Sequence, residues 1–323
     1  MVNCMKYIDA AQTAEMLKSK DNILILTHYH PDGDTLGSAF ALCRALRKLG
    51  KRARVHNEEA INPKFSFLWE DMEQQDFEED FVMSVDVAAA ELLGEKTQAR
   101  YADKITLAID HHSSNSLEVP YIYLEGDSAA NAELIMLVID ELGVEIDALT
   151  AGCIYTGVST DTGCFRYGNV TRRSFQIAGR MLDLGADLYN INIKMFETKT
   201  KGMIKIEEMV LNSVEYAFGG KCAMVTITQD MFKQTGTTEN DCEAISSLPR
   251  QIEGVLVGIT IKERKNGMFK ASVRSRAPVN SANICIALGG GGHSEAAGCR
   301  FDGTLEQFKE KLLEEVEKEL NRR

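Results

Sequence analysis

The chain has 323 residues, of which 44% are hydrophobic and 26% are charged, and its formal net charge is −12 at pH 7. This length favours two domains, because a single hydrophobic core rarely grows beyond about 250–300 residues. The acidic balance argues against a protein that holds long nucleic acid on a broad basic face. It leaves room for a small phosphorylated ligand, because bound divalent cations can reverse the local potential.

Two further absences narrow the class of protein. No stretch approaches the roughly 20 apolar residues of a membrane span, and the first residues lack the basic-then-apolar layout of a signal peptide. The eight cysteines are scattered without a C-x-x-C pair, so neither a disulfide framework nor a zinc knuckle is expected. We therefore expect a cytoplasmic protein with no membrane partner.

In chain order, the first two hundred residues alternate between helix-like and strand-like stretches. The expected helices are 9–20, 36–49, 128–142, 147–158, 171–184 and 187–198, and the expected strands are 22–27, 51–56, 81–85 and 104–109. Strands separated by helix-length stretches are typical of a parallel sheet with helices on both faces. The sequence therefore predicts an α/β fold with an N-terminal, mostly parallel sheet.

The pattern changes after residue 198, where charged residues and a glycine at 197–202 mark a domain junction. Residues 213–228 suggest a hairpin, and so do 255–274, which contain Asn266-Gly267, a strong hairpin-turn signal. A charged helix is expected near the C-terminus, at 304–321. The expected divisions are a first domain at 1–198, a linker region at 199–212 and a smaller α/β domain at 213–323.

Imidazole and carboxylate side chains cluster where the expected strands of the first domain end. The carboxyl ends of parallel strands meet at one edge of a sheet, where ligands bind. Four carboxylates and two imidazoles suit two divalent cations, with Mn²⁺ as first choice and Mg²⁺, Co²⁺ or Fe²⁺ as alternatives. The absence of cysteine argues against structural zinc. The candidate ligands are His28, Asp32, Asp34, Asp86, His111 and Asp161.

Each of these aspartates alone would more often be a helix cap or a turn residue, but together they favour a two-metal site. Such a site clamps the oxygens of an in-line phosphoryl displacement. Asp86 is the expected bridge, because its strand should lie between the other two. His112 is placed to hydrogen-bond a phosphoryl oxygen or to protonate the leaving alkoxide. Asp110 is expected to orient the histidines, although a strand-end cap is nearly as good an explanation. His30 is expected either to contact a metal ligand or to lie at the surface, and His56 to have a structural role.

A run of four glycines, Gly289–Gly292, precedes His293. Glycines let backbone N–H groups approach a phosphate closely, and a helix starting after them would add a favourable dipole. Arg274 is the best candidate for a phosphate contact in the nearby basic hairpin, because a guanidinium forks onto phosphate oxygens. A glycine run alone is more often a flexible turn. Only the surrounding pattern, G-G-G-G-H-x-x-A-A-G, favours a phosphate-binding loop.

These motifs resemble those of the DHH phosphoesterase superfamily with its DHH-associated C-terminal domain. In length and motif set the chain is most similar to the NrnA-like nanoRNase and pAp phosphatase group, which degrades very short oligonucleotides. The resemblance implies one metal on His28, Asp32 and Asp86, and another on Asp34, Asp86, His111 and Asp161. The motifs are H-x-x-P-D-x-D-x-x-G-S at 28–38, Asp86, D-H-H at 110–112, T-D-T-G at 160–163, V-R-S at 273–275 and G-G-G-G-H-x-x-A-A-G at 289–298.

The resemblance also implies a function: a Mn²⁺-dependent hydrolase with a catalytic first domain, a substrate-binding second domain and a cleft between them. His112 and Asp110 would be catalytic. The expected substrates are short oligoribonucleotides, pAp or pApA, and not long nucleic acid. Two alternative functions stay open, a cyclic di-AMP phosphodiesterase and a non-catalytic nucleotide sensor. The sequence also leaves undetermined the native metal, the direction of cleavage and whether the protein forms a homodimer. The expected substrate-binding residues are Arg274, Ser275, Gly290, Gly291, Gly292 and His293.

Overall fold

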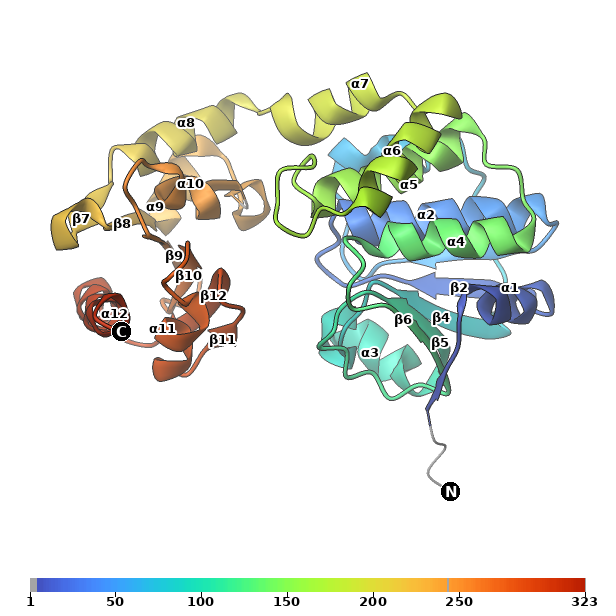
Figure 1. Cartoon of the computed structure of the whole chain (residues 1–323), viewed down its shortest axis with the longest axis horizontal. Coiled ribbons are helices and arrows are strands. Elements are labelled where there is room, and N and C mark those ends of the chain that lie inside the picture. The colour runs from blue at the N-terminus through green and yellow to red at the C-terminus, as the bar shows by residue number, and fades with distance from the viewer. Residues whose placement is uncertain (1–4, 243, 323) are drawn as a thin grey trace. The chain divides into compact units, whose positions relative to one another are not determined.

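The computed structural model describes residues 5–242 and 244–322 and divides into two compact units, Met1–Thr198 and Lys199–Arg323 (Figure 1). The stretch 199–212, predicted as a linker, is mostly helix α8 (Lys201–Leu211) and belongs to the second unit. Within the described residues, no helix combines the length and the apolar character needed to cross a membrane. Seven of the eight cysteines are free thiols, and Cys4 lies outside the described residues.

A six-stranded sheet, parallel throughout, forms the centre of the first unit. Its strands are β1 (Lys6–Tyr7), β2 (Ile23–Leu26), β3 (Ala53–His56), β4 (Phe81–Val85), β5 (Ile105–Asp110) and β6 (Tyr121–Leu124). Their order across the sheet is β1-β6-β5-β4-β2-β3. Strand β2 thus has β3 on one side and β4 on the other, so the direction of winding switches between β2 and β4. In open α/β sheets, such a switch is where ligands bind.

Helices cover both faces of this sheet (Figure 1). They are α1 (Ala10–Lys18), α2 (Gly33–Lys48), α3 (Glu95–Tyr101), α4 (Asn131–Leu142), α5 (Ala148–Asp161), α6 (Arg172–Asp183) and α7 (Leu188–Asn192), with short 3₁₀ turns at Pro63–Leu68, Ala90–Leu93 and Ala102–Lys104 and a π-helical turn at Ile193–Glu197. Ile23 and Ile25 of β2 join the core under α2, α4 and α5, whereas Leu24 joins the core that includes Tyr101 of α3. Alternate residues are therefore buried on opposite faces, as a doubly covered parallel sheet requires. The predicted α/β fold is confirmed.

Helices α2 and α5 pack closely because glycines line their contact. A methyl group at Gly37 of α2 would lie 2.4 Å from the carbonyl oxygen of Cys153 and 2.8 Å from the amide nitrogen of Gly157. Both contacts are with the backbone of α5, so no side chain can rotate away to make room. The contact fixes α2, whose first turn follows the loop 27–32 after β2.

We expect Gly37→Ala to lower the free energy of unfolding by about 1–3 kcal/mol, since an added methyl group in a close-packed contact forces the backbones apart. Gly179→Ala is the matched control, because Gly179 lies within α6 and a methyl group there meets nothing within 4 Å. It should leave stability unchanged or raise it by up to about 1 kcal/mol through helix propensity. Chemical denaturation measures both, and equal stability of the two variants would contradict this packing.

The second unit is built on a mixed sheet in the order β11-β12-β10-β9-β8-β7. Its elements are α8, β7 (Glu215–Ala217), β8 (Cys222–Ile227), α9 (Gln229–Thr235), α10 (Leu248–Gln251), β9 (Val257–Glu263), β10 (Phe269–Ser275), α11 (Ser281–Ala287), β11 (Gly291–Gly292), β12 (Ala296–Phe301) and α12 (Leu305–Leu320), with 3₁₀ turns at Phe218–Gly220, Glu239–Cys242 and Ala244–Ser247. Both predicted hairpins are confirmed, because β7 pairs with β8 and β9 with β10 in antiparallel fashion. Phe308 and Leu312 of α12 are fully buried in the core of this unit.

Candidate metal centre

The candidate ligands of the first unit converge at the carboxyl edge of the parallel sheet, around the switch between β2 and β4. His28 follows β2, Asp86 directly follows β4, and His111 directly follows β5. Asp34 lies in the first turn of α2. Asp161, predicted in a loop, is instead the last residue of α5.

The first group of donor atoms surrounds His28. Its Nε2 lies 3.7 Å from Asp32 Oδ1 and 3.8 Å from Asp86 Oδ2. Donors that share one cation at about 2.1 Å lie roughly 3–4 Å from one another, so this spacing suits a metal ion. Asp32 is also the N-cap of α2, where Oδ1 accepts the N–H groups of Asp34 and Thr35.

The second group surrounds His111. Its Nε2 lies 3.4 Å from Asp86 Oδ1, 3.4 Å from Asp161 Oδ2 and 3.8 Å from Asp34 Oδ2. Asp86 therefore presents one oxygen to each group, as a carboxylate bridging two cations would. The structure brings all six candidate ligands together in these two groups.

Asp86 provides an independent test of whether a cation fits. Only 3% of the residue is exposed, and its buried Oδ1 accepts no hydrogen bond within the described part of the chain. Its φ of +57° is a conformation that few residues other than glycine adopt, although Asp and Asn do so more often than most. A buried, unsatisfied carboxylate oxygen is costly. A divalent cation between the two groups would satisfy it.

His111 is oriented through its other ring nitrogen. Nδ1 lies 3.1 Å from the carbonyl oxygen of Ser128, an acceptor to which it can only donate. In the neutral imidazole that would bind a metal ion, the proton therefore sits on Nδ1, and the lone pair of Nε2 faces the carboxylates. Asp110 was expected to orient both histidines; for His111 this role falls to Ser128.

Asp34 is held by the start of α4. Its Oδ2 accepts the backbone N–H of Asn131 at 2.6 Å, and its Oδ1 accepts the N–H of Ala132 at 2.9 Å. The N-cap residue of α4 is Ala130, which offers no capping side chain. Asp34 therefore caps α4 from another helix, and the positive end of the helix dipole favours its charged form.

The four carboxylates repel one another strongly in the metal-free protein. Burial and the charge of Asp86 raise the pKa of Asp34 to about 8, and burial and the charge of Asp34 raise the pKa of Asp161 to about 9. Burial alone would lower the pKa of His111, but the nearby carboxylates of Asp86, Asp34 and Asp161 raise it to about 10. Protons thus take the place that cations would fill, which is the behaviour of a metal site.

His112 lies beside this centre and is held by Asp110. Its Nδ1 is 2.8 Å from Asp110 Oδ1, while Asp110 Oδ2 accepts a hydrogen bond from Asn115 at 2.6 Å. The bond to Asp110 raises the pKa of His112 and leaves Nε2 for a ligand. With Tyr29 and Leu92, His112 lines a pocket of about 320 Å³ that also exposes His28, Asp86 and Asp161.

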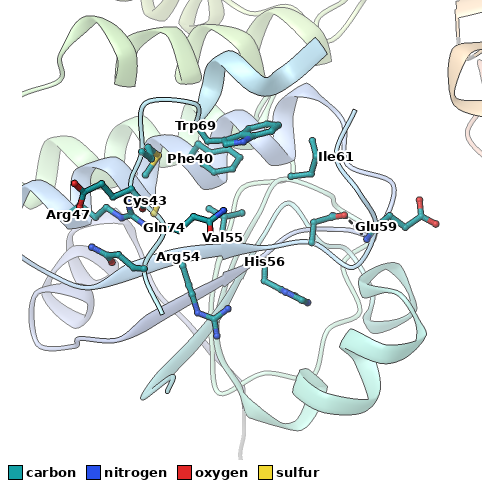
Figure 2. Close-up of a pocket in the computed structure, with 14 residues that line it drawn as sticks. Phe40, Cys43, Arg47, Arg54, Val55, His56, Glu59, Ile61, Trp69 and Gln74 are labelled. Atoms are coloured by element: carbon teal, nitrogen blue, oxygen red, sulfur yellow. Dashed lines mark hydrogen bonds between the residues drawn. The ribbon is translucent and has the colours of Figure 1, made fainter. Parts of the chain in front are cut away.

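A second pocket, of about 490 Å³, runs along the edge strand β3 (Figure 2). It is lined by the stacked rings of Phe40 and Trp69, whose centroids are 5.1 Å apart, and contains none of the candidate ligands. Its wall nevertheless supports the centre, because Asn57 donates to the carbonyl oxygen of His28 at 2.6 Å. No motif in the sequence pointed to Asn57 or Ser128, since both act on or through the main chain.

The second unit holds the remaining candidates and corrects one expectation, for Ser275. The segment after the glycine run is strand β12, so it adds no helix dipole, and Gly291 and Gly292 pair with it as β11. Ser275 is fully buried, and its hydroxyl lies 2.9 Å from the carbonyl oxygen of Val279 and is part of the fold, so it is unavailable to substrate.

Arg274 and His293 belong to neighbouring parts of this sheet. Arg274 on β10 pairs across the ladder with Ala296 of β12, and the N–H of exposed His293 donates to the carbonyl oxygen of Ala296. A methyl group at Gly290 would lie 2.2 Å from the carbonyl oxygen of Gly298, so this glycine is required for the backbones to approach. The turn that carries His293 is thereby fixed beside the end of β10.

The family models and one curated relative define the class of protein. Residues 22–158 match the DHH family, N-terminal domain, and residues 217–322 match the DHHA1 domain. The chain is 33% identical to the bifunctional oligoribonuclease and PAP phosphatase NrnA of Thermus thermophilus, across 96% of this chain and 94% of that protein. The chain belongs to the DHH phosphoesterase superfamily. It is a hydrolase that acts on phosphoester bonds.

Solved structures share the fold. An exopolyphosphatase-related protein from Bacteroides fragilis superposes with a TM-score of 0.86 at 23% identity and covers 96% of both chains. The exonuclease RecJ bound to manganese superposes with a TM-score of 0.55 at 14% identity, across 98% of this chain and 96% of that one. The architecture of both units is therefore shared with known DHH proteins.

Proposed function

We propose that this protein uses two divalent cations, with Mn²⁺ preferred, to hydrolyse short oligoribonucleotides to mononucleotides and to remove the 3′-phosphate of pAp. The observation that carries the proposal is the placement of Asp86, whose two oxygens face two separate groups of donor atoms. The name of the 33% identical Thermus relative, an oligoribonuclease and PAP phosphatase, supports the substrate class.

The residues divide the chemistry among them. One cation would be held by His28, Asp32 and Asp86, and the other by Asp34, Asp86, His111 and Asp161. Two such cations supply an activated water and neutralise charge on the phosphoryl oxygens. His112, whose pKa Asp110 raises, would donate from Nε2 to a phosphoryl oxygen or to the leaving alkoxide.

We assign binding of the substrate's terminal phosphate to the second unit. The guanidinium of Arg274, the imidazole of His293 and the backbone N–H groups of Gly290, Gly291 and Gly292 are suitable donors. The net charge of −12 disfavours long strands, which need many phosphate contacts along a basic face. Short substrates with a terminal phosphate therefore suit this chain best.

A substrate panel with Mn²⁺ tests the proposal. We expect two molecules of AMP from pApA, one AMP and one adenosine from the unphosphorylated dinucleotide ApA, phosphate from pAp, and little product from cyclic di-AMP. Because a hydrogen bond to a charged group contributes about 1.5–3 kcal/mol, pApA should exceed ApA in kcat/KM by roughly 10–100-fold. Preference for cyclic di-AMP would support the rival phosphodiesterase, and tight binding without products would support a nucleotide sensor.

A further inference from the structure

The segment 125–132 runs from the end of β6 into the first turn of α4, and its main chain holds two of the proposed metal ligands. The carbonyl oxygen of Ser128 accepts a hydrogen bond from Nδ1 of His111. The backbone N–H groups at the start of α4 donate hydrogen bonds to the carboxylate of Asp34. These two ligands belong to the same group of donors. Any contact that fixes this segment therefore fixes the geometry of one metal position.

A buried carboxylate anchors the segment from behind. Glu133 on α4 is 0% exposed, and its Oε2 accepts hydrogen bonds from the hydroxyl of Ser128 and from Nε of Arg173, both at 2.9 Å. Its Oε1 accepts the hydroxyl of Ser174 at 2.7 Å. Arg173 also donates from Nη2 to Glu125 at 2.8 Å. The guanidinium of Arg173 on α6 thus links Glu125, at the start of the segment, to Glu133, just after its end.

We propose that Glu133 and Arg173 are positioning residues for the metal centre, which they serve through Ser128 and the start of α4 without touching a ligand atom. The inference rests on the proposed function, because it assigns the network to a metal site. Removing Arg173 would leave Glu133 as a buried charge with one fewer donor, which is strongly unfavourable. The segment would then shift to hydrate the carboxylate and would carry the partners of His111 and Asp34 with it.

The test compares Arg173→Gln with Arg180→Gln. Mn²⁺ is titrated into each metal-free variant, and calorimetry measures the binding. Arg180 is a matched control, because it joins the same two helices through a bidentate pair with Asp140, with both distances 2.6 Å. Loss of a group that supports a metal ligand typically weakens affinity 10–100-fold. We expect a loss of that size for Arg173→Gln, partial recovery in Arg173→Lys, and no change for Arg180→Gln.

Amide hydrogen exchange of the metal-free variants provides a second readout. Residues 125–134 should exchange faster in Arg173→Gln than in Arg180→Gln. If Arg173→Gln fails to fold, Ser128→Ala breaks the same chain of contacts and should also weaken Mn²⁺ binding. The inference is overturned if a folded variant of this network keeps Mn²⁺ affinity within about twofold of the unchanged protein. Failure of the proposed function would instead appear as absence of Mn²⁺ binding or substrate turnover by the unchanged protein.

Discussion

Asp86→Asn should reduce phosphoester hydrolysis by at least about a thousandfold. The bridging carboxylate holds both cation positions, and cations provide several kcal/mol of transition-state stabilisation, each 1.36 kcal/mol being a factor of ten in rate. Asparagine is chosen over alanine because it tolerates the φ of +57° at this position. The variant should therefore fold normally and fail in catalysis.

Two controls separate this effect from general damage. Asp183→Asn removes an exposed carboxylate at the end of α6 and should leave kcat/KM unchanged. Without metal, Asp86→Asn should also melt at the same temperature as the unchanged protein or higher, because it removes one charge from a crowded cluster. Full Mn²⁺-dependent turnover of pApA by Asp86→Asn would refute the two-metal site.

Mn²⁺ should raise the melting temperature of the first unit by roughly 10–20 °C. Each site filled at a hundred times its Kd adds about 2.7 kcal/mol, and each kcal/mol shifts a domain of this size by about 2–4 °C. The increase should be larger at pH 8 than at pH 6. Cations and protons compete for Asp34 and Asp161, whose pKa values are raised to about 8 and about 9.

The metal-free protein should show the opposite trend with pH. Asp34 and Asp161 bind protons more tightly in the folded than in the unfolded chain, so their contribution to stability falls as pH rises from about 4 to 9. The raised pKa of His111 acts in the same direction, since its contribution is full below about 6.5 and is lost toward 10. Scanning calorimetry with Mn²⁺ and with a chelator measures both trends; a melting temperature insensitive to Mn²⁺ at either pH would count against the site.

The residue types of the metal centre were visible in the sequence, but its supports were not. Asp86 and His111 could be found because each follows an apolar strand, and parallel strands end at a common edge. Ser128 acts through its carbonyl oxygen and Asn131 through its N–H, and any residue type carries these groups. Sequence patterns therefore identify the ligands and miss the main-chain groups that orient them.

The second unit shows where local preference is overridden by pairing. The stretch Ala296–Phe301 has no β-branched residue, yet it forms β12, because β10 provides a full antiparallel ladder beside it. The segment after the glycine run is therefore a strand and adds no helix dipole. Strand β6 was also not predicted, although β2 and β3, which are equally short, were.

Asp34 is both a proposed metal ligand and the cap of α4, which matters for the design of a catalytically inactive variant that still binds substrate. Replacing Asp34 would remove the hydrogen-bond acceptor of the first turn of α4. The same substitution would therefore reduce both turnover and stability. Among the residues that the structure describes, the carboxylate of Asp161 at the end of α5 caps no helix, so Asp161 is the safer position to replace.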